Sequence, residues 1–137
     1  MPVLSFAALL LIGFLSVSPG YAAETYWQTV AARVATKIDS VHERFRAGDG
    51  RAARQALTEA YFAEFEDSKM EAAIRKELGV DRARQLERSF GTLRKAVKSN
   101  DGGAVNRLAA ELKAALASDG KRLDAAGVPP EVFAVNQ

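Results

Sequence analysis

The chain has 137 residues, enough for one small domain, and its composition excludes several functions at once. It contains no cysteine, which rules out disulfides, thiol catalysis, iron–sulfur clusters and covalently attached c-type haem. The net charge of +2 comes from acidic and basic residues that are mixed along the chain, as on solvated helix faces. A nucleic-acid-binding protein would gather its cations on one stripe, so we expect no nucleic-acid partner.

The N-terminus has the layout of a leader for export. Residues 3–17 are apolar except for Ser5, Gly13 and Ser16, and a Ser-Pro-Gly break follows. Small residues then precede a predicted cleavage point after Ala22 or Ala23, as in a secretory signal peptide. The alternative is an uncleaved anchor, although this run of about 15 residues is shorter than the roughly 20 of a spanning helix. Residues 1–22 are therefore predicted to be a signal peptide or membrane anchor, and the protein to be periplasmic.

The rest of the sequence is rich in helix formers and predicts four amphipathic helices. They span about residues 24–46, 51–78, 81–98 and 104–126, with glycine-containing turns between them. The apolar pattern of the second helix changes phase near residues 66–68, which predicts a kink or a break. Asp81 is expected to cap the third helix, and Gly120 to fray or bend the fourth.

Each predicted helix carries one apolar stripe. In the first helix the stripe recurs at three- and four-residue steps through Trp27, Val30, Val34, Ile38, Val41 and Phe45. Such stripes can be buried only against each other. We therefore predict an all-α fold, an antiparallel up-and-down bundle of about four helices over residues 23–128, with a C-terminal tail at 129–137.

Carboxylates gather on the second predicted helix. If that helix is continuous, Glu64, Asp67 and Glu71 fall on one stripe, at positions i, i+3 and i+7, with Glu66 on an adjoining stripe. Clustered oxygen ligands suit hard cations such as ferric iron, calcium or magnesium. The alternative is that these carboxylates simply face water and are neutralised by Arg75 or a nearby lysine.

The sequence offers few other groups for chemistry. His42, the only histidine, lies at the edge of an apolar stripe, where it could join carboxylates in a metal site or hydrogen-bond a neighbour. A haem held between His42 and Met70 is an alternative, but Met70 is more simply a core residue, so no haem is expected. No catalytic triad, phosphate loop or zinc motif is present, and no enzyme is predicted. The aromatic residues expected in the core are Tyr61, Phe62, Phe65 and Phe90.

Two segments resemble the extracytoplasmic helical region of bacterial Ftr-type iron permeases. They are Ala60-Tyr61-Phe62-x-x-Phe65-Glu66-x-Ser68-x-Met70-Glu71-Ala72-Ala73-Ile74 and Leu86-Glu87-x-x-Phe90-Gly91-x-Leu93-Arg94. The similarity covers about residues 53–97, and both the Arg-Glu-x-x-Glu transport motif and the membrane helices of that family are missing. The resemblance implies a domain that lies outside the membrane near iron. It makes Glu66 and Glu71 candidate iron-handling residues, with Glu64, Asp67 and Glu87 as supporting candidates.

These observations lead to one expectation and two alternatives. We expect a periplasmic accessory domain of iron uptake that works beside a membrane permease. Its carboxylates would bind or pass on a cation, and iron is the candidate cation. The first alternative is a structural or interaction module that docks onto a membrane partner without a metal. The second is a haem-binding bundle cytochrome.

Overall fold

The computed structural model describes residues 25–133, with side chains as far as Glu131. Within this range the chain is helical and has no strand. The elements are α1 (Tyr26–Arg46), α2 (Gly50–Glu59), the π-helix η1 (Ala60–Glu66), α3 (Met70–Glu77), α4 (Val80–Lys98), α5 (Gly102–Ala125) and the 3-10 turn η2 (Pro130–Phe133).

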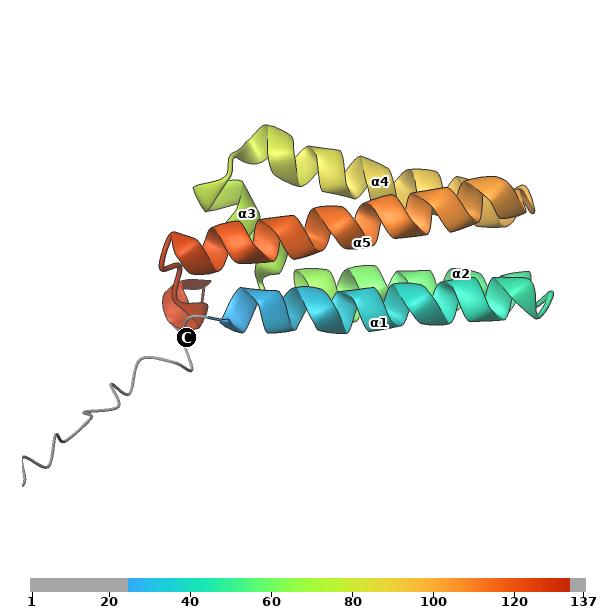
Figure 1. Cartoon of the computed structure of the whole chain (residues 1–137), viewed down its shortest axis with the longest axis horizontal. Coiled ribbons are helices and arrows are strands. Elements are labelled where there is room, and N and C mark those ends of the chain that lie inside the picture. The colour runs from blue at the N-terminus through green and yellow to red at the C-terminus, as the bar shows by residue number, and fades with distance from the viewer. Residues whose placement is uncertain (1–24, 134–137) are drawn as a thin grey trace, which may run out of the picture.

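The elements form an antiparallel bundle of four rods, and the predicted all-α fold is confirmed (Figure 1). The second rod consists of α2 and η1, and after the predicted break at residues 67–69 the short helix α3 crosses the end of the bundle to the start of α4 (Figure 1). α1 packs against α5 and α2, and α4 packs against α5 and α3. Among the described residues, none of the helices is both long and apolar enough to cross a membrane. The leader predicted for residues 1–22 lies outside the described residues, as do residues 134–137 of the tail.

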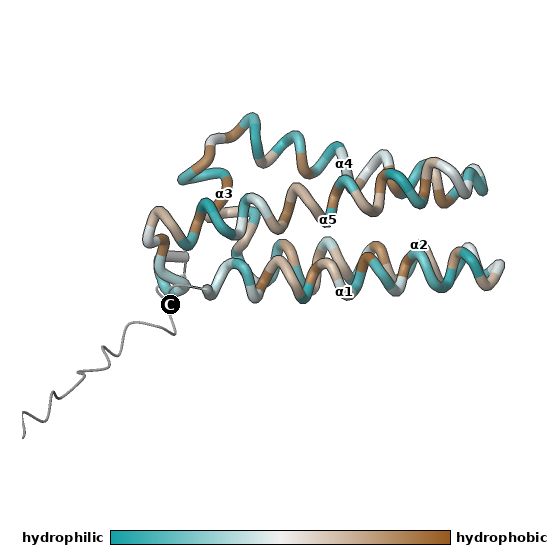
Figure 2. Tube along the Cα trace, in the orientation of Figure 1, coloured by the Kyte–Doolittle hydropathy of each residue, from teal (hydrophilic) through white to brown (hydrophobic). Residues whose placement is uncertain are grey.

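The core is built from the apolar stripes. Along each helix, apolar and polar residues alternate with the helical period (Figure 2). The α1 stripe is buried as predicted, except that Phe45 at its end is partly buried. Fully buried large side chains come from every long helix, and they include Trp27, Ile38, Leu57, Phe65, Met70, Leu86, Leu93 and Leu112.

Aspartates start two of the helices. Asp49 accepts a hydrogen bond from the backbone nitrogen of Ala52 at the start of α2, and Asp101 does the same for Ala104 in α5. The predicted cap of α4 by Asp81 is wrong, because that helix begins one residue earlier, after Gly79. With its φ of +102°, Gly79 turns the chain directly from α3 into α4. Asp81 therefore lies inside the first turn with a fully exposed side chain.

The C-terminal end of α5 holds the start of α1. Thr25 makes no side-chain cap, but the Asp124 carboxylate accepts from the backbone nitrogens of Trp27 and Gln28, at 2.9 and 3.0 Å. The Trp27 indole N–H donates to the Val128 carbonyl at 2.6 Å. α5 does not fray at Gly120, because the helix continues to Ala125 and this glycine is buried within it. A Cβ there would lie 2.9 Å from the Trp27 carbonyl oxygen, so glycine permits the close approach of α1.

Candidate functional site

The break in the second rod decides where the predicted site residues point. η1 has i to i−5 backbone bonding, as from the Asp67 nitrogen to the Phe62 carbonyl, and Lys69 then takes a left-handed φ of +68°. Ser68 bridges the break, because its hydroxyl donates to the Phe65 carbonyl and accepts from the Met70 nitrogen. The helix is therefore not continuous. The prediction that Glu64, Asp67 and Glu71 share one stripe required a continuous helix, so it does not apply.

Two of the predicted carboxylates lie apart from the others. Glu64 turns toward α1, where it forms an ion pair with Arg33 at 3.2 Å. Asp67 is exposed within the break itself.

The other three candidates gather around one tyrosine and one arginine. The same guanidinium nitrogen of Arg75 lies 2.5 Å from a carboxylate oxygen of Glu71 and 2.8 Å from one of Glu87. The Tyr61 hydroxyl donates to the other oxygen of Glu71 at 3.4 Å. Glu66 is exposed and lines the same open hollow of about 420 Å³ as Glu71 and Arg75. The site thus joins η1, α3 and α4, and we call Tyr61, Glu66, Glu71, Arg75 and Glu87 the Arg75 cluster.

The surroundings within the Arg75 cluster shift the pKa values of two of its side chains, Tyr61 and Arg75. Burial, the negative charges of Glu71, Glu87 and Glu66, and the hydrogen bond to Glu71 raise the pKa of Tyr61 to about 12. The hydrogen bond from its guanidinium to Glu71 raises the pKa of Arg75 above its ordinary value. Arg75 therefore stays charged and occupies the position between two carboxylates where a bound cation would neutralise them. No group of three or more histidine or acidic side chains is placed to hold a metal within residues 25–131. Metal binding at these carboxylates stays a prediction.

The shifted Tyr61 pKa predicts a loss of stability at high pH. The folded state favours the neutral phenol, so its contribution is complete below pH about 10 and is lost as the pH rises toward about 12. Urea unfolding at stepwise increasing pH should show the free energy of unfolding falling across this window. The Tyr61→Phe variant has no phenol to ionise and should show a smaller decline. Identical declines in the two proteins would contradict the assignment.

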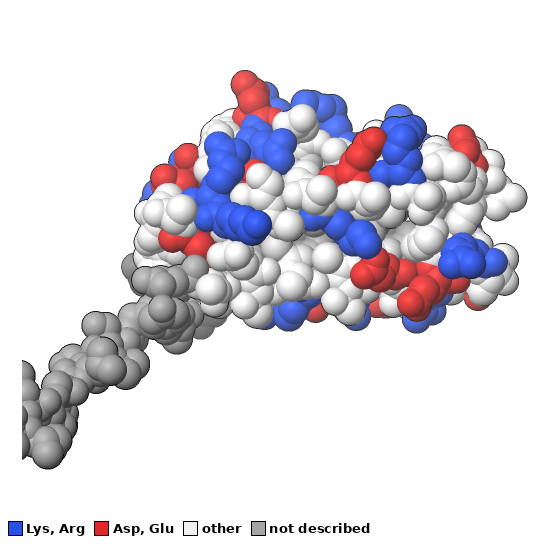
Figure 3. All heavy atoms as spheres, viewed as in Figure 1, with Lys and Arg blue, Asp and Glu red and all other residues white. Residues whose placement is uncertain are grey.

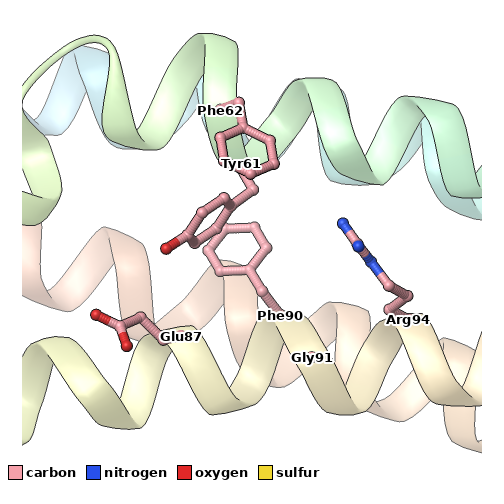
Figure 4. A pocket seen from close by; sticks show the side chains of 6 residues that line it. All are labelled: Tyr61, Phe62, Glu87, Phe90, Gly91 and Arg94. Carbon is pink, nitrogen blue, oxygen red and sulfur yellow. The ribbon is translucent and has the colours of Figure 1, made fainter.

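An apolar groove lies beside the Arg75 cluster, between η1 and α4. Its volume is about 220 Å³, and its lining residues are Tyr61, Phe62, Glu87, Phe90, Gly91 and Arg94. The Tyr61 ring stands edge-on to Phe62 and to Phe90, with centroids 4.9 and 5.1 Å apart. Figure 4 shows Tyr61 and Phe90 meeting across the groove, with Glu87 on one side and Arg94 on the other.

Phe62 is the unexpected member of this groove. The prediction that it belongs to the core is wrong, because its side chain is 53% exposed, whereas Phe65 and Phe90 are buried and Tyr61 is partly buried. Its position follows from the π-helix, whose wider turn presents Phe62 outward while Phe65 points inward. Opposite it, a Cβ added at Gly91 would meet no atom within 4 Å, so this wall of the groove is open.

The remaining candidates lie elsewhere. Met70 is fully buried in the core, in agreement with the simpler of its two interpretations, and His42 is half-buried on α1. No sequence pattern predicted the place of Arg94 beside the groove or the bridging role of Arg75. The spacing of Glu71 and Arg75, four residues apart on one helix, could have suggested their ion pair. Comparisons with protein-family models, curated proteins and solved structures give no match.

Proposed function

We propose that this chain is a non-catalytic helical domain that docks onto a membrane protein of iron uptake through the groove between η1 and α4. The observation that carries the docking is Phe62, a large aromatic side chain that stays 53% exposed beside a groove with aromatic walls. The other parts of the proposal rest on the sequence alone. The leader supports export to the periplasm, and the resemblance of residues 53–97 to iron permeases supports iron uptake with a permease as partner.

The chemistry of the groove favours a protein partner over a small substrate. About 220 Å³ is below the usual volume of a small-molecule site, and the groove is open along Gly91. Exposed aromatic and arginine side chains are the residues that contribute most to protein interfaces. Phe62 and Phe90 offer the apolar contact, and Arg94, which donates to Thr58 at 3.3 Å, offers a charge at one end. We therefore expect the partner to insert one apolar side chain next to a carboxylate.

Photo-crosslinking tests the docking. A photoreactive phenylalanine analogue at Phe62 should form an adduct with a polytopic membrane protein of iron uptake in intact cells, and chelators should not abolish it. The matched control carries the same analogue at Gln55, which is exposed on α2. An adduct at Gln55 but not at Phe62, or adducts only with soluble proteins, would contradict the proposal.

Cation handling at the Arg75 cluster is the second candidate function. The observation that favours it is that Glu71 and Glu87 share the Arg75 guanidinium, while Glu66 lines the adjoining hollow. A cation that binds Glu71 and Glu87 must first displace the Arg75 guanidinium from both. Arg75 would then act as a resident counterion, which holds the two carboxylates together until a cation replaces it.

Metal titration of variants tests this exchange. Arg75→Met removes the competing charge-assisted hydrogen bonds, so its affinity for Fe³⁺ or Fe²⁺ should exceed that of the wild type by about 10-fold or more. Calorimetry should show no binding to Glu71→Gln/Glu87→Gln. The control variant Glu64→Gln/Asp67→Asn, which removes two carboxylates outside the cluster, should bind like the wild type. Absence of binding in both the wild type and Arg75→Met would end the metal proposal.

A further inference from the structure

The outward face of α4 concentrates positive charge that looks mixed in the sequence. Residues 84, 88, 91, 95 and 98 recur at three- and four-residue steps, so they share one side of the helix, and all five are exposed. Four of them are cations, and the exposed Arg94 borders them. We call Arg84, Arg88, Arg94, Lys95 and Lys98 the α4 basic stripe. Lys and Arg side chains recur along the edge of the molecule that α4 forms, with some Asp and Glu side chains among them (Figure 3).

Carboxylates neutralise little of the α4 basic stripe. Within the part of the chain that the structure describes, its ion pairs are limited to a contact of 3.9 Å between Arg84 and the fully exposed Asp81. Glu87, the other acidic residue of α4, is turned to Arg75. Some cations elsewhere on the surface have closer partners, such as Arg33 with Glu64 and Lys113 with Asp39. The cations of the α4 basic stripe therefore share one helix of about 28 Å with little neutralisation.

We propose that the α4 basic stripe binds the anionic headgroups of a phospholipid bilayer. Charge complementarity supports it, because several cations within reach of one surface attract anionic lipids, each by about five-fold in affinity. The predicted leader would bring the domain to the periplasmic side of such a membrane. A second copy of the chain is a poor occupant, since two stripes would repel each other. This inference goes beyond the proposed docking and does not depend on it, because it needs neither Phe62 nor an iron-uptake partner.

Sedimentation of the full chain with phospholipid vesicles tests the inference. Binding should be tighter to phosphatidylcholine vesicles that contain phosphatidylglycerol than to vesicles without it, and added salt should remove the difference. Any contribution of the leader is common to all variants, so the phosphatidylglycerol-dependent part isolates the stripe. Arg84→Gln/Arg88→Gln/Lys95→Gln should weaken this part by roughly 100-fold.

A matched variant controls for the loss of positive charge in general. Arg44→Gln/Arg46→Gln/Lys121→Gln removes the same charge from exposed positions on α1 and α5, and it should bind nearly as well as the wild type. Equal losses in the two triple variants, or no preference for phosphatidylglycerol, would overturn the inference. So would stripe-dependent binding to duplex DNA or to an acidic protein that exceeds binding to the vesicles. Circular dichroism confirms that each variant is folded, and Phe62→Ser, which weakens only the proposed docking, should leave vesicle binding intact.

Discussion

Replacing Trp27 by alanine should lower the free energy of unfolding by about 3–5 kcal/mol. The side chain is fully buried at the point where the end of α5 meets the start of α1. The substitution removes this packing and the hydrogen bond from the indole to the Val128 carbonyl. It also leaves a cavity that the closely packed helices around it cannot fully close.

Urea unfolding followed by circular dichroism measures this loss. Fluorescence is unsuitable, because Trp27 is the only tryptophan of the chain. Trp27→Phe keeps an aromatic ring and should cost clearly less than Trp27→Ala. The adjacent, partly buried Tyr26 is the matched control, and Tyr26→Ala should cost no more than half as much. A cost below about 1 kcal/mol for Trp27→Ala would mean that this end of the bundle contributes little to stability.

The sequence was sufficient to predict the helices because their apolar residues follow a strict period. The α1 stripe and the break after residue 66 both follow from where apolar side chains recur, and both are confirmed. These features depend on neighbours three or four residues away. A local pattern therefore contains the information that determines them.

Contacts between distant residues could not be predicted in this way. Asp124 supplies the cap for α1 from 97 residues along the chain, so a capping rule applied to Thr25 and its sequence neighbours cannot identify it. Gly120 looks like a helix breaker in the sequence, yet its role is set by the backbone of α1 against which it packs. In each case the partner belongs to another rod, and only the packed bundle identifies it.

The candidate site was predicted in part for the same reason. Glu71 and Glu87 lie together because α3 and α4 are neighbours, which residue spacing along the sequence could not show. Glu64 and Asp67 were grouped with them on the assumption of a regular helix. The π-helix and the left-handed Lys69 after it interrupt the regular helix between Glu64 and Glu71, and Phe62 lies exposed within the π-helix.

Replacing Asp119 by alanine should lower the free energy of unfolding by about 3 kcal/mol. The carboxylate is fully buried and accepts from Arg82 on α4 at 2.7 Å and from Arg122 at 3.3 Å. Arg122 is half-exposed and can turn to solvent, but the Arg82 side chain is only 23% exposed and would lose its counterion. The matched control is Asp39→Ala, which removes an ion pair with Lys113 that both partners make at the surface, and it should cost less than about 1 kcal/mol.

A double-mutant cycle separates the ion pair from simple loss of packing. In the Arg82→Met background no buried guanidinium is left unpaired, so Asp119→Ala should cost less there than in the wild type. Asp119→Leu combined with Arg82→Met replaces both charges by apolar groups and should recover much of the lost stability. An equal cost of Asp119→Ala in both backgrounds would show that the pairing with Arg82 does not hold α4 against α5. The stability of the α4–α5 contact would then be assigned to other interactions, first of all to the packing of their apolar stripes.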